Sequence, residues 1–455
     1  MKLETQIAHT PSPHGTADLK RHLRPDFLWG AATSAAQIEG AALVDGRGPS
    51  IWDAFAARSG TIKDGSNLDV ACDHYHRWPQ DVAMMREMGL QAYRFSISWS
   101  RVQPQGRGAW NEAGFDFYDR LVDGLLAAGI QPHLTLFHWD LPQALDAQLG
   151  GLLHRDVAQH FANYAAEVGR RLGDRLASIS TLNEPLCSAI LGYETGQFAP
   201  GRRNRGEAMQ VAHHLLLMHG QAIQALRAQT RTRLGIVLNQ TPTYPAENRE
   251  EDRVAARIED GLGVRWYMDP VFRGQYPADI VEHLGADAPA VLAGDLATIA
   301  QPLDFLGINF YTRRYVSTQE PPLSAPGHQG FTDMGWEIFP KALSQHLVRI
   351  QREYAPPPIY ITENGMANAD QLEGEHIHDV PRICYVAEHL RAIAKAVEMG
   401  VDVRGYFYWS LMDNFEWDSG YAKRFGLVHV DYATQQRRLK DSAVWYRDFI
   451  AAHPG

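Results

Sequence analysis

The sequence predicts an α/β fold, a closed (β/α)8 TIM barrel in a single domain, and three observations lead to that prediction. Short runs rich in β-branched and aromatic residues recur eight times along the 455-residue chain. Most intervals between them show a helical pattern, and strand–helix alternation is typical of a parallel sheet with right-handed crossovers. Eight such repeats are the number that closes a barrel. The predicted strands are 27–35, 90–99, 130–139, 176–184, 233–240, 303–311, 358–365 and 403–411.

The first half of the chain supplies four of these strands. "FLWGAATSA" opens the series, and "LQAYRFSISW" follows the helical "DVAMMREMG". "IQPHLTLFHW" follows "YDRLVDGLLAAG", and "LASISTLNE" follows "HFANYAAEVGRRLG". Gly89 and Gly129 stand between a helical run and the next strand, where a glycine commonly ends a helix. These signals predict helix ends directly before the second and third strands.

The second half repeats the pattern. "RLGIVLNQ" follows "AHHLLLMHGQAIQALRA", then come "LDFLGINFY" and "PIYITENG", and "VRGYFYWSL" follows "VAEHLRAIAKAVEMG" with Gly400 at its end. An open doubly wound sheet is the alternative, but no Gly-rich phosphate loop follows the first strand. Polar stretches near 198–208, 316–333 and 366–380 are predicted to be long loops after strands. Loops on that side of a barrel build its active site.

Composition limits the class of protein. We expect a polar N-terminal extension at 1–24 and one catalytic barrel at 25–455. The net charge of −10 disfavours nucleic acid as a partner, and no apolar run approaches the roughly 20 residues that span a membrane. Cys72, Cys187 and Cys384 are far apart, which disfavours a disulfide framework or a zinc site. With no apolar signal segment, the sequence predicts a cytoplasmic protein.

Two glutamates stand in matching local contexts. Glu184 in "TLNEP" and Glu363 in "ITENG" each end a predicted strand and precede a chain breaker. A barrel brings the carboxyl ends of its strands to one face, where both side chains would meet. Glycoside hydrolysis needs two carboxyls, about 5–5.5 Å apart for retention of configuration and farther apart for inversion. One isolated glutamate would more often be a salt-bridged strand-end residue, whereas the matched pair favours catalysis.

Longer motifs extend this interpretation. "YRFSISWSR", "HWDLPQAL", "TLNEP", "GINFYT", "YITENG" and "YWSLMDNFEW" resemble, in order, the motif set of glycoside hydrolase family 1, the retaining β-glucosidases, from about residue 25 to 450. The resemblance implies that Glu363 is the nucleophile, Glu184 the general acid/base, and the intermediate a covalent glycosyl-enzyme. Arg94, Asn309 and Tyr311 resemble the residues that support the nucleophile. Arg94 and Tyr311 are expected to lower the pKa of Glu363, whose charge should hold the pKa of Glu184 up.

The resemblance also implies a sugar-binding set. Trp336 resembles the platform of the leaving-group site, and Phe425 is either a site wall or core. A carboxylate at Glu416 would repel a 6-phosphate, so the expected substrates are unphosphorylated β-glucosides and short β-linked oligosaccharides, with β-galactosides and β-fucosides. The implied substrate-binding residues are Gln37, His138, Trp139, Asn183, Trp336, Trp409, Glu416, Trp417 and Phe425.

Four residues depart from the family pattern: Ala36, Leu152, Leu186 and Phe198. Leu186 and Phe198 lie in the loop after the implied acid/base and leave the aglycone preference open. Two functions are alternatives to hydrolysis. The first is net transglycosylation, which uses the same motifs. The second is sugar binding without catalysis, but such a protein would lack one of the two glutamates. The partners expected are small β-glycosides, and a homo-oligomer stays open.

Two histidine-rich stretches are candidates for a metal site. His74 and His76 are two residues apart, as on a metal-binding strand, and His213 and His214 are adjacent. None has the H-E-x-x-H spacing, so packing and hydrogen bonding are the favoured roles. We expect no metal and no cofactor.

Overall fold

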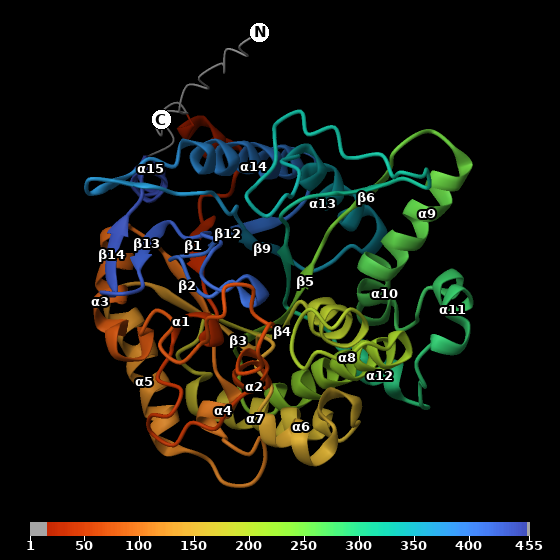
Figure 1. The fold of residues 1–455 in the computed structure, drawn as a ribbon, viewed down its shortest axis with the longest axis horizontal. Helices are drawn as coiled ribbons and strands as arrows, with labels where there is room; N and C mark the ends of the chain where they lie inside the picture. The colour runs from red at the N-terminus through yellow and green to blue at the C-terminus, as the bar shows by residue number, and fades with distance from the viewer. Residues whose placement is uncertain (1–15, 453–455) are drawn as a thin grey trace.

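The computed structural model, which describes residues 16–452, is a closed barrel of eight parallel strands, as predicted from the sequence (Figure 1). Each strand coincides with one of the predicted runs. Around the barrel the order is β1-β12-β9-β7-β5-β4-β3-β2. The strands are β1 Leu28–Ala32, β2 Ala92–Ser96, β3 Gln131–Phe137, β4 Ser178–Asn183, β5 Arg233–Asn239, β7 Phe305–Asn309, β9 Ile359–Asn364 and β12 Val403–Trp409.

Helices surround the strands on the outside (Figure 1). The longer ones are α3 His74–Glu87, α5 Glu112–Ala127, α7 Val157–Leu172, α8 Arg205–Arg227, α9 Glu250–Asp260, α13 Lys341–Tyr354, α14 Val380–Glu398 and α15 Asp441–Ala451. Shorter ones are α1 Ala35–Ile38, α2 Ile51–Ala56, α4 Trp99–Val102, α6 Gln143–Leu149, α10 Trp266–Arg273, α11 Ala278–Leu284 and α12 Asp295–Ile299. 3-10 and π helices are η1 Ala17–His22, η2 Gly151–Leu153, η3 Cys187–Glu194, η4 Gly261–Arg265, η5 Gly285–Asp287 and η6 Trp417–Ser419. No helix within residues 16–452 is long and apolar enough to cross a membrane.

The strands are buried because both of their faces are covered. Every residue of β1, β2, β4, β7 and β9 is buried, as expected for parallel strands between a filled interior and a layer of helices. Gly89, Gly129 and Gly400 have φ of 66°, 77° and 91°, a backbone conformation that glycine adopts at no steric cost. They end α3, α5 and α14 directly before a strand, as the sequence predicted.

Of the three predicted long loops, 366–380 contains a small sheet, and 198–208 is cut short by the start of α8 at Arg205. The stretch 366–380 holds the hairpin β10 Leu372–Glu373 and β11 His376–Ile377. The start of 316–333 follows a two-stranded parallel sheet of β6 Thr243–Pro245 and β8 Arg314–Val316. A third pair, β13 Val428–Asp431 with β14 Gln436–Leu439, follows β12. Such two- to four-residue strands are too short to leave a periodic signal in the sequence.

Of the predicted extension 1–24, residues 1–15 lie outside the described residues. Ala17–His22 form η1, and the Lys20 ammonium donates to the carbonyls of Ile450 and Ala452 at 2.8 and 2.7 Å. These bonds join the start of the described chain to the end of α15. The boundary at residue 24 stays a prediction.

Candidate functional site

The two glutamates lie at the carboxyl ends of β4 and β9, which are separated by β5 and β7 in the barrel. Glu184 directly follows β4, and its N–H donates to the Val237 carbonyl on β5 at 2.9 Å. Glu363 lies in β9, in register with Asn309 at the end of β7. Both are buried, with 6% and 3% of their surfaces exposed. The sheet therefore delivers both carboxyls to one end of the barrel interior.

Backbone strain marks this end of the barrel. Trp139, Glu184 and Trp417 have φ of 78°, 44° and 48°, a region that residues with a Cβ rarely occupy. They follow β3, β4 and β12. Strained residues persist where the surrounding structure holds them, and they cluster at functional sites.

Glu363 is held by a cation and a phenol. Arg94 on β2 donates from a guanidinium nitrogen to Oε1 at 2.6 Å, and the Tyr311 hydroxyl donates to Oε2 at 2.7 Å. Burial raises the pKa of Glu363, while the charge of Arg94 and the hydrogen bonds from Arg94 and Tyr311 act in the opposite, expected direction. Both contacts favour the ionised form, which a nucleophile requires.

Glu184 has different partners. The Asn309 amide donates to its Oε1 at 2.7 Å, and the Cys187 thiol donates to its Oε2 at 3.0 Å. Within residues 16–452, no basic side chain forms an ion pair with Glu184. Burial, followed by the nearby charge of Glu363, raises the pKa of Glu184 to about 7. A carboxyl with this pKa is available as a proton donor near neutrality.

Asn183 connects the residues around the two carboxyls. Its Oδ1 accepts from Arg94 at 2.7 Å and from the Asn309 amide at 3.0 Å. Its Nδ2 lies 3.1 Å from Nε2 of His138. Burial holds the pKa of His138 well below its usual range, so the neutral ring accepts this bond. The Trp139 indole donates to the Asn183 carbonyl at 2.8 Å.

Glu416 is a carboxyl with an unused oxygen. Its Oε2 is buried and has no hydrogen-bond partner among the described residues. Burial, then the charges of Glu363 and Asp418, raises the pKa of Glu416 to about 8. A buried polar atom in this state calls for a polar ligand. Gln37 donates to the carbonyl of the preceding residue, Phe415, at 2.8 Å, which places the predicted Gln37 and Glu416 side by side.

Aromatic rings form two groups, one next to His138 and one next to Tyr311. The His138 ring stacks on Trp409 and Trp417 with centroids 5.7 and 5.9 Å apart. In the second group, Tyr311 packs against Trp336 at 5.4 Å and Phe425 at 6.1 Å. Phe425 is therefore buried and also touches the tyrosine that holds Glu363.

One departure from the family pattern lies behind this aromatic layer. Phe198, with 8% of its surface exposed, packs on Trp139 and Trp417 with centroids 5.5 and 6.2 Å apart. Leu152 and Ala36 are buried, and Leu186 is half-buried. Phe198 thus supports the tryptophans of the predicted sugar-binding set.

The contacts above connect all the predicted site residues except Gln37 and Glu416, which are joined to the group through the chain at Phe415 and Trp417. Sequence reasoning missed Cys187 and Thr362, whose hydroxyl donates to Oδ1 of Asn309 at 2.7 Å. Cys187 is three residues after Glu184, but Glu184 has φ of 44° and lies before the helix, so helical spacing does not predict this contact.

The histidine-rich stretches have hydrogen-bonded roles. His74 and His76 lie on helix α3, not on a strand, and their Nδ1 atoms lie 2.7 and 2.6 Å from Asp81 and Asp73. The described residues contain no group of three or more side chains that could hold a metal ion.

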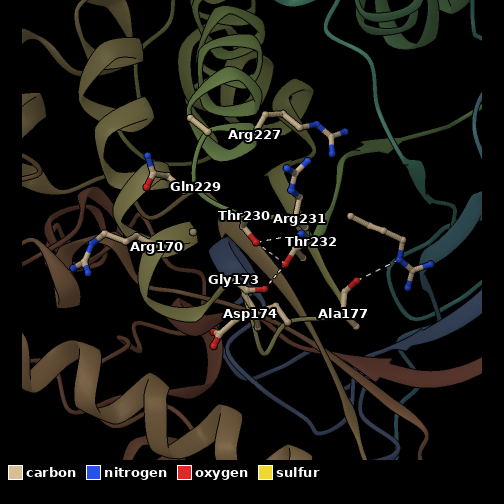
Figure 2. A pocket seen from close by; sticks show the side chains of 13 residues that line it. Arg170, Gly173, Asp174, Ala177, Arg227, Gln229, Thr230, Arg231 and Thr232 are labelled. Carbon is tan, nitrogen blue, oxygen red and sulfur yellow. Dashed lines mark hydrogen bonds between the residues drawn. The ribbon is translucent and has the colours of Figure 1, made fainter.

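A cavity of about 680 Å³ lies at the other end of the barrel (Figure 2). Residues 176–177, which precede β4, and 231–233, which lead into β5, are part of its lining. Figure 2 shows the Thr232 hydroxyl hydrogen-bonded to the Gly173 carbonyl, with Asp174 next to Gly173. No predicted site residue lines it. The amino ends of barrel strands more often serve stability than catalysis.

Two carboxyls with different hydrogen-bond partners lie at the carboxyl end of a (β/α)8 barrel, among polar and aromatic side chains that can bind a sugar. This fold and this site together define a glycoside hydrolase. Comparison with known proteins agrees. The profile of glycosyl hydrolase family 1 matches residues 19–454. A β-glucosidase from Agrobacterium sp. is 45% identical over 94% of this chain and 95% of its own length. A bifunctional β-D-glucosidase/β-D-fucosidase from Bifidobacterium breve is 44% identical over 94% and 98%.

Solved structures give the same result. The family 1 β-glucosidase from Thermotoga maritima has a TM-score of 0.91 at 41% identity, covering 94% of this chain and 98% of that one. The chain therefore belongs to glycosyl hydrolase family 1, a family of retaining glycosidases. It is an enzyme of the β-glucosidase type.

Proposed function

We propose that Glu363 is the nucleophile and Glu184 the general acid/base of a retaining, exo-acting β-glucosidase. The observation that carries this assignment is the difference between their partners. Glu363 has Arg94 at 2.6 Å, whereas Glu184 has the neutral donors Asn309 and Cys187. The cation favours an ionised nucleophile, and the absence of one leaves Glu184 free to keep its proton near neutrality.

In the first step an oxygen of Glu363 attacks the anomeric carbon. The bond from that carbon to the glycosidic oxygen breaks, and Glu184 gives its proton to the departing oxygen. A covalent glycosyl ester of Glu363 and a free aglycone result. Asn183, fixed by Arg94 and Asn309, is proposed to bind the sugar 2-hydroxyl, a contact that strengthens in the transition state.

In the second step Glu184 acts as a base. Esterification removes the charge of Glu363, the second cause of the raised pKa of Glu184, so that pKa falls. Glu184 takes a proton from water as the water oxygen attacks the anomeric carbon. The ester bond breaks, Glu363 is released as carboxylate, and the sugar leaves with its β configuration.

The expected substrates are unphosphorylated β-glucosides and short β-linked oligosaccharides such as cellobiose. Glu416 and Gln37 can accept and donate hydrogen bonds to sugar hydroxyls. With a pKa of about 8, Glu416 carries no positive charge in either of its states, so it offers a phosphate group no compensating cation. The name of the Bifidobacterium breve relative supports β-fucosides as further substrates. We also propose β-galactosides, because the same polar set can serve either sugar.

We further propose that the protein works in the cytoplasm. Cys72, Cys187 and Cys384 are free thiols, as is usual in a reducing compartment. Whether copies form a homo-oligomer is tested by light scattering of the purified chain.

Proton NMR of the sugar first released from an aryl β-glucoside tests the mechanism. The proposal expects the β anomer within the first minutes, before mutarotation. The α anomer as first product would mean single displacement and would remove the nucleophile role from Glu363. Glu363→Ala is the matched control, because without the nucleophile it should release sugar far more slowly than the wild type.

A further inference from the structure

Cys187 touches the proposed acid/base twice. It is the first residue of η3, the helix that follows the turn after β4. Its N–H donates to the Glu184 carbonyl at 3.0 Å, and its thiol sulfur lies 3.0 Å from Oε2 of Glu184. This backbone bond closes the turn between Glu184 and Cys187, so the turn that presents the carboxyl also places the thiol beside it.

The two oxygens of Glu184 have distinct roles, which Arg94 determines. A guanidinium only donates, so the Asn183 atom 2.7 Å from Arg94 is an oxygen. The Asn309 atom 3.0 Å from that oxygen is therefore the amide nitrogen. The same nitrogen lies 2.7 Å from Oε1 of Glu184. Because it donates to Oε1 in either state of the carboxyl, the transferable proton belongs on Oε2.

A thiol can pair with Oε2 in both states of the carboxyl. It is a weak donor toward the carboxylate and a weak acceptor toward the carboxylic acid. Burial and the negative charge of Glu184 hold the pKa of the Cys187 thiol well above its usual range. The S–H proton is therefore retained at working pH, and thiolate chemistry is disfavoured.

We propose that Cys187 is a positioning residue for the acid/base. Its thiol holds Oε2 of Glu184, and this oxygen carries the transferred proton because the Asn309 amide occupies Oε1. This inference rests on the proposed role of Glu184. Two effects follow. The thiol favours the carboxylate, so it limits the rise in the pKa of Glu184. It also orients Oε2, so its loss should lower turnover more than substrate binding.

The pH dependence of kcat/KM tests the first effect. Cys187→Val removes the donor and acceptor at similar volume, and Cys187→Ser keeps both. With an aryl β-glucoside that has a poor leaving group, the alkaline limb of the Val variant should move up by roughly half a pH unit or more. The Ser variant should return it toward the wild-type position. Cys384→Val, on helix α14, should leave it unmoved.

Leaving-group dependence tests the second effect. Dinitrophenolate leaves a dinitrophenyl β-glucoside without needing a proton. Cys187→Val should therefore transfer the glycosyl group from this substrate at the wild-type rate, while kcat for the substrate with a poor leaving group should fall several-fold. An equal loss with both substrates and an unmoved alkaline limb would show a packing role only and overturn the proposal. If Cys187→Val does not fold, Cys187→Ala takes its place with the same expected shift.

Failure of the underlying function is a separate outcome. Glu184→Gln should abolish the alkaline limb with the poor leaving group. A limb that persists in Glu184→Gln would remove the acid/base role from Glu184 itself, and the role of Cys187 would fall with it. A limb that is lost in Glu184→Gln but unmoved in Cys187→Val would overturn the inference on Cys187 alone.

Discussion

The guanidinium of Arg94 lies 2.6 Å from Oε1 of Glu363, with both side chains almost fully buried. A second nitrogen of the same group donates to Asn183 at 2.7 Å. One side chain from β2 thus connects the proposed nucleophile to the residue before the proposed acid/base. Because a buried ion pair broken on one side leaves an uncompensated charge, Arg94 is expected to control the ionisation of Glu363.

Replacing Arg94 tests this relationship. Arg94→Met should raise the pKa of Glu363 further, so the acid limb of the kcat/KM profile should move to higher pH. Activity at the optimum should fall by at least about 10²-fold, as for loss of a charge-stabilising donor. Arg94→Lys keeps the cation but loses the planar fork, so it should retain the acid limb near its wild-type position. An unmoved acid limb in Arg94→Met would contradict the role.

The proposed acid predicts the other limb of the profile. The pKa of Glu184 is about 7, so Glu184 is protonated below that pH and activity should fall as the pH rises through it. Glu184→Gln cannot give a proton and should lose about 10²–10⁴-fold with poor leaving groups. Steady-state rates measured across pH 5–9 test both the alkaline fall in activity and its loss in Glu184→Gln. Glu388→Gln, on the exposed face of α14, serves as the control.

Much of this site could be predicted from the sequence, because the residues lie at strand ends. Asn183, Glu363 and Trp409 are in or at the end of strands whose apolar runs are unmistakable, and a barrel brings such ends together. The contact of Cys187 with Glu184 was missed because it depends on the local turn after β4. The orphan oxygen of Glu416 was also invisible, since burial of one atom depends on loops distant in sequence.

Ionisation of the buried Glu416 carboxyl, whose Oε2 has no partner among the described residues, destabilises the folded state. The pKa of Glu416 is raised to about 8 from a usual 4.5, so the folded state binds this proton more tightly than the unfolded chain does. Its contribution to stability is complete below pH 4.5 and is lost as the pH rises to about 8. Glu416→Gln should therefore raise the melting temperature at pH 8 by a few degrees and change it little at pH 4.5. It should also weaken glucoside binding.

Differential scanning calorimetry at the two pH values checks this prediction, with KM measured in parallel. Glu388→Gln, an exposed change of the same chemistry, should leave the melting temperature nearly equal at both. If Glu416→Gln had a lower melting temperature than the wild type at pH 8, the Glu416 carboxylate would have a hydrogen-bond partner or counter-charge in the free protein, which would contradict the prediction.

The loops on either side of the site are joined by buried charges. The Lys440 ammonium, with none of its side chain exposed, lies 2.5 Å from Asp370 and 2.7 Å from Asp413. Asp370 lies in the segment after Glu363, and Asp413 precedes Glu416. Arg382 pairs with Asp370 at 2.8 Å, and Arg424 pairs with Asp413 at 2.6 Å. Lys440 therefore bridges the segment after the nucleophile to the one that carries the sugar-binding carboxyl.

Lys440→Met should destabilise the fold, because it leaves two carboxylates buried with one cation fewer. Breaking such a pair typically costs about 3–5 kcal/mol, whereas an exposed pair contributes about 0–1 kcal/mol. Lys395→Met, which breaks the exposed pair with Glu398 at 2.9 Å, is the matched control and should change stability little. Adding Asp413→Asn to Lys440→Met removes one uncompensated charge and should recover part of the loss. Urea unfolding of the four chains measures this coupling, and equal losses in the two Lys variants would show that the bridge contributes nothing beyond a surface pair.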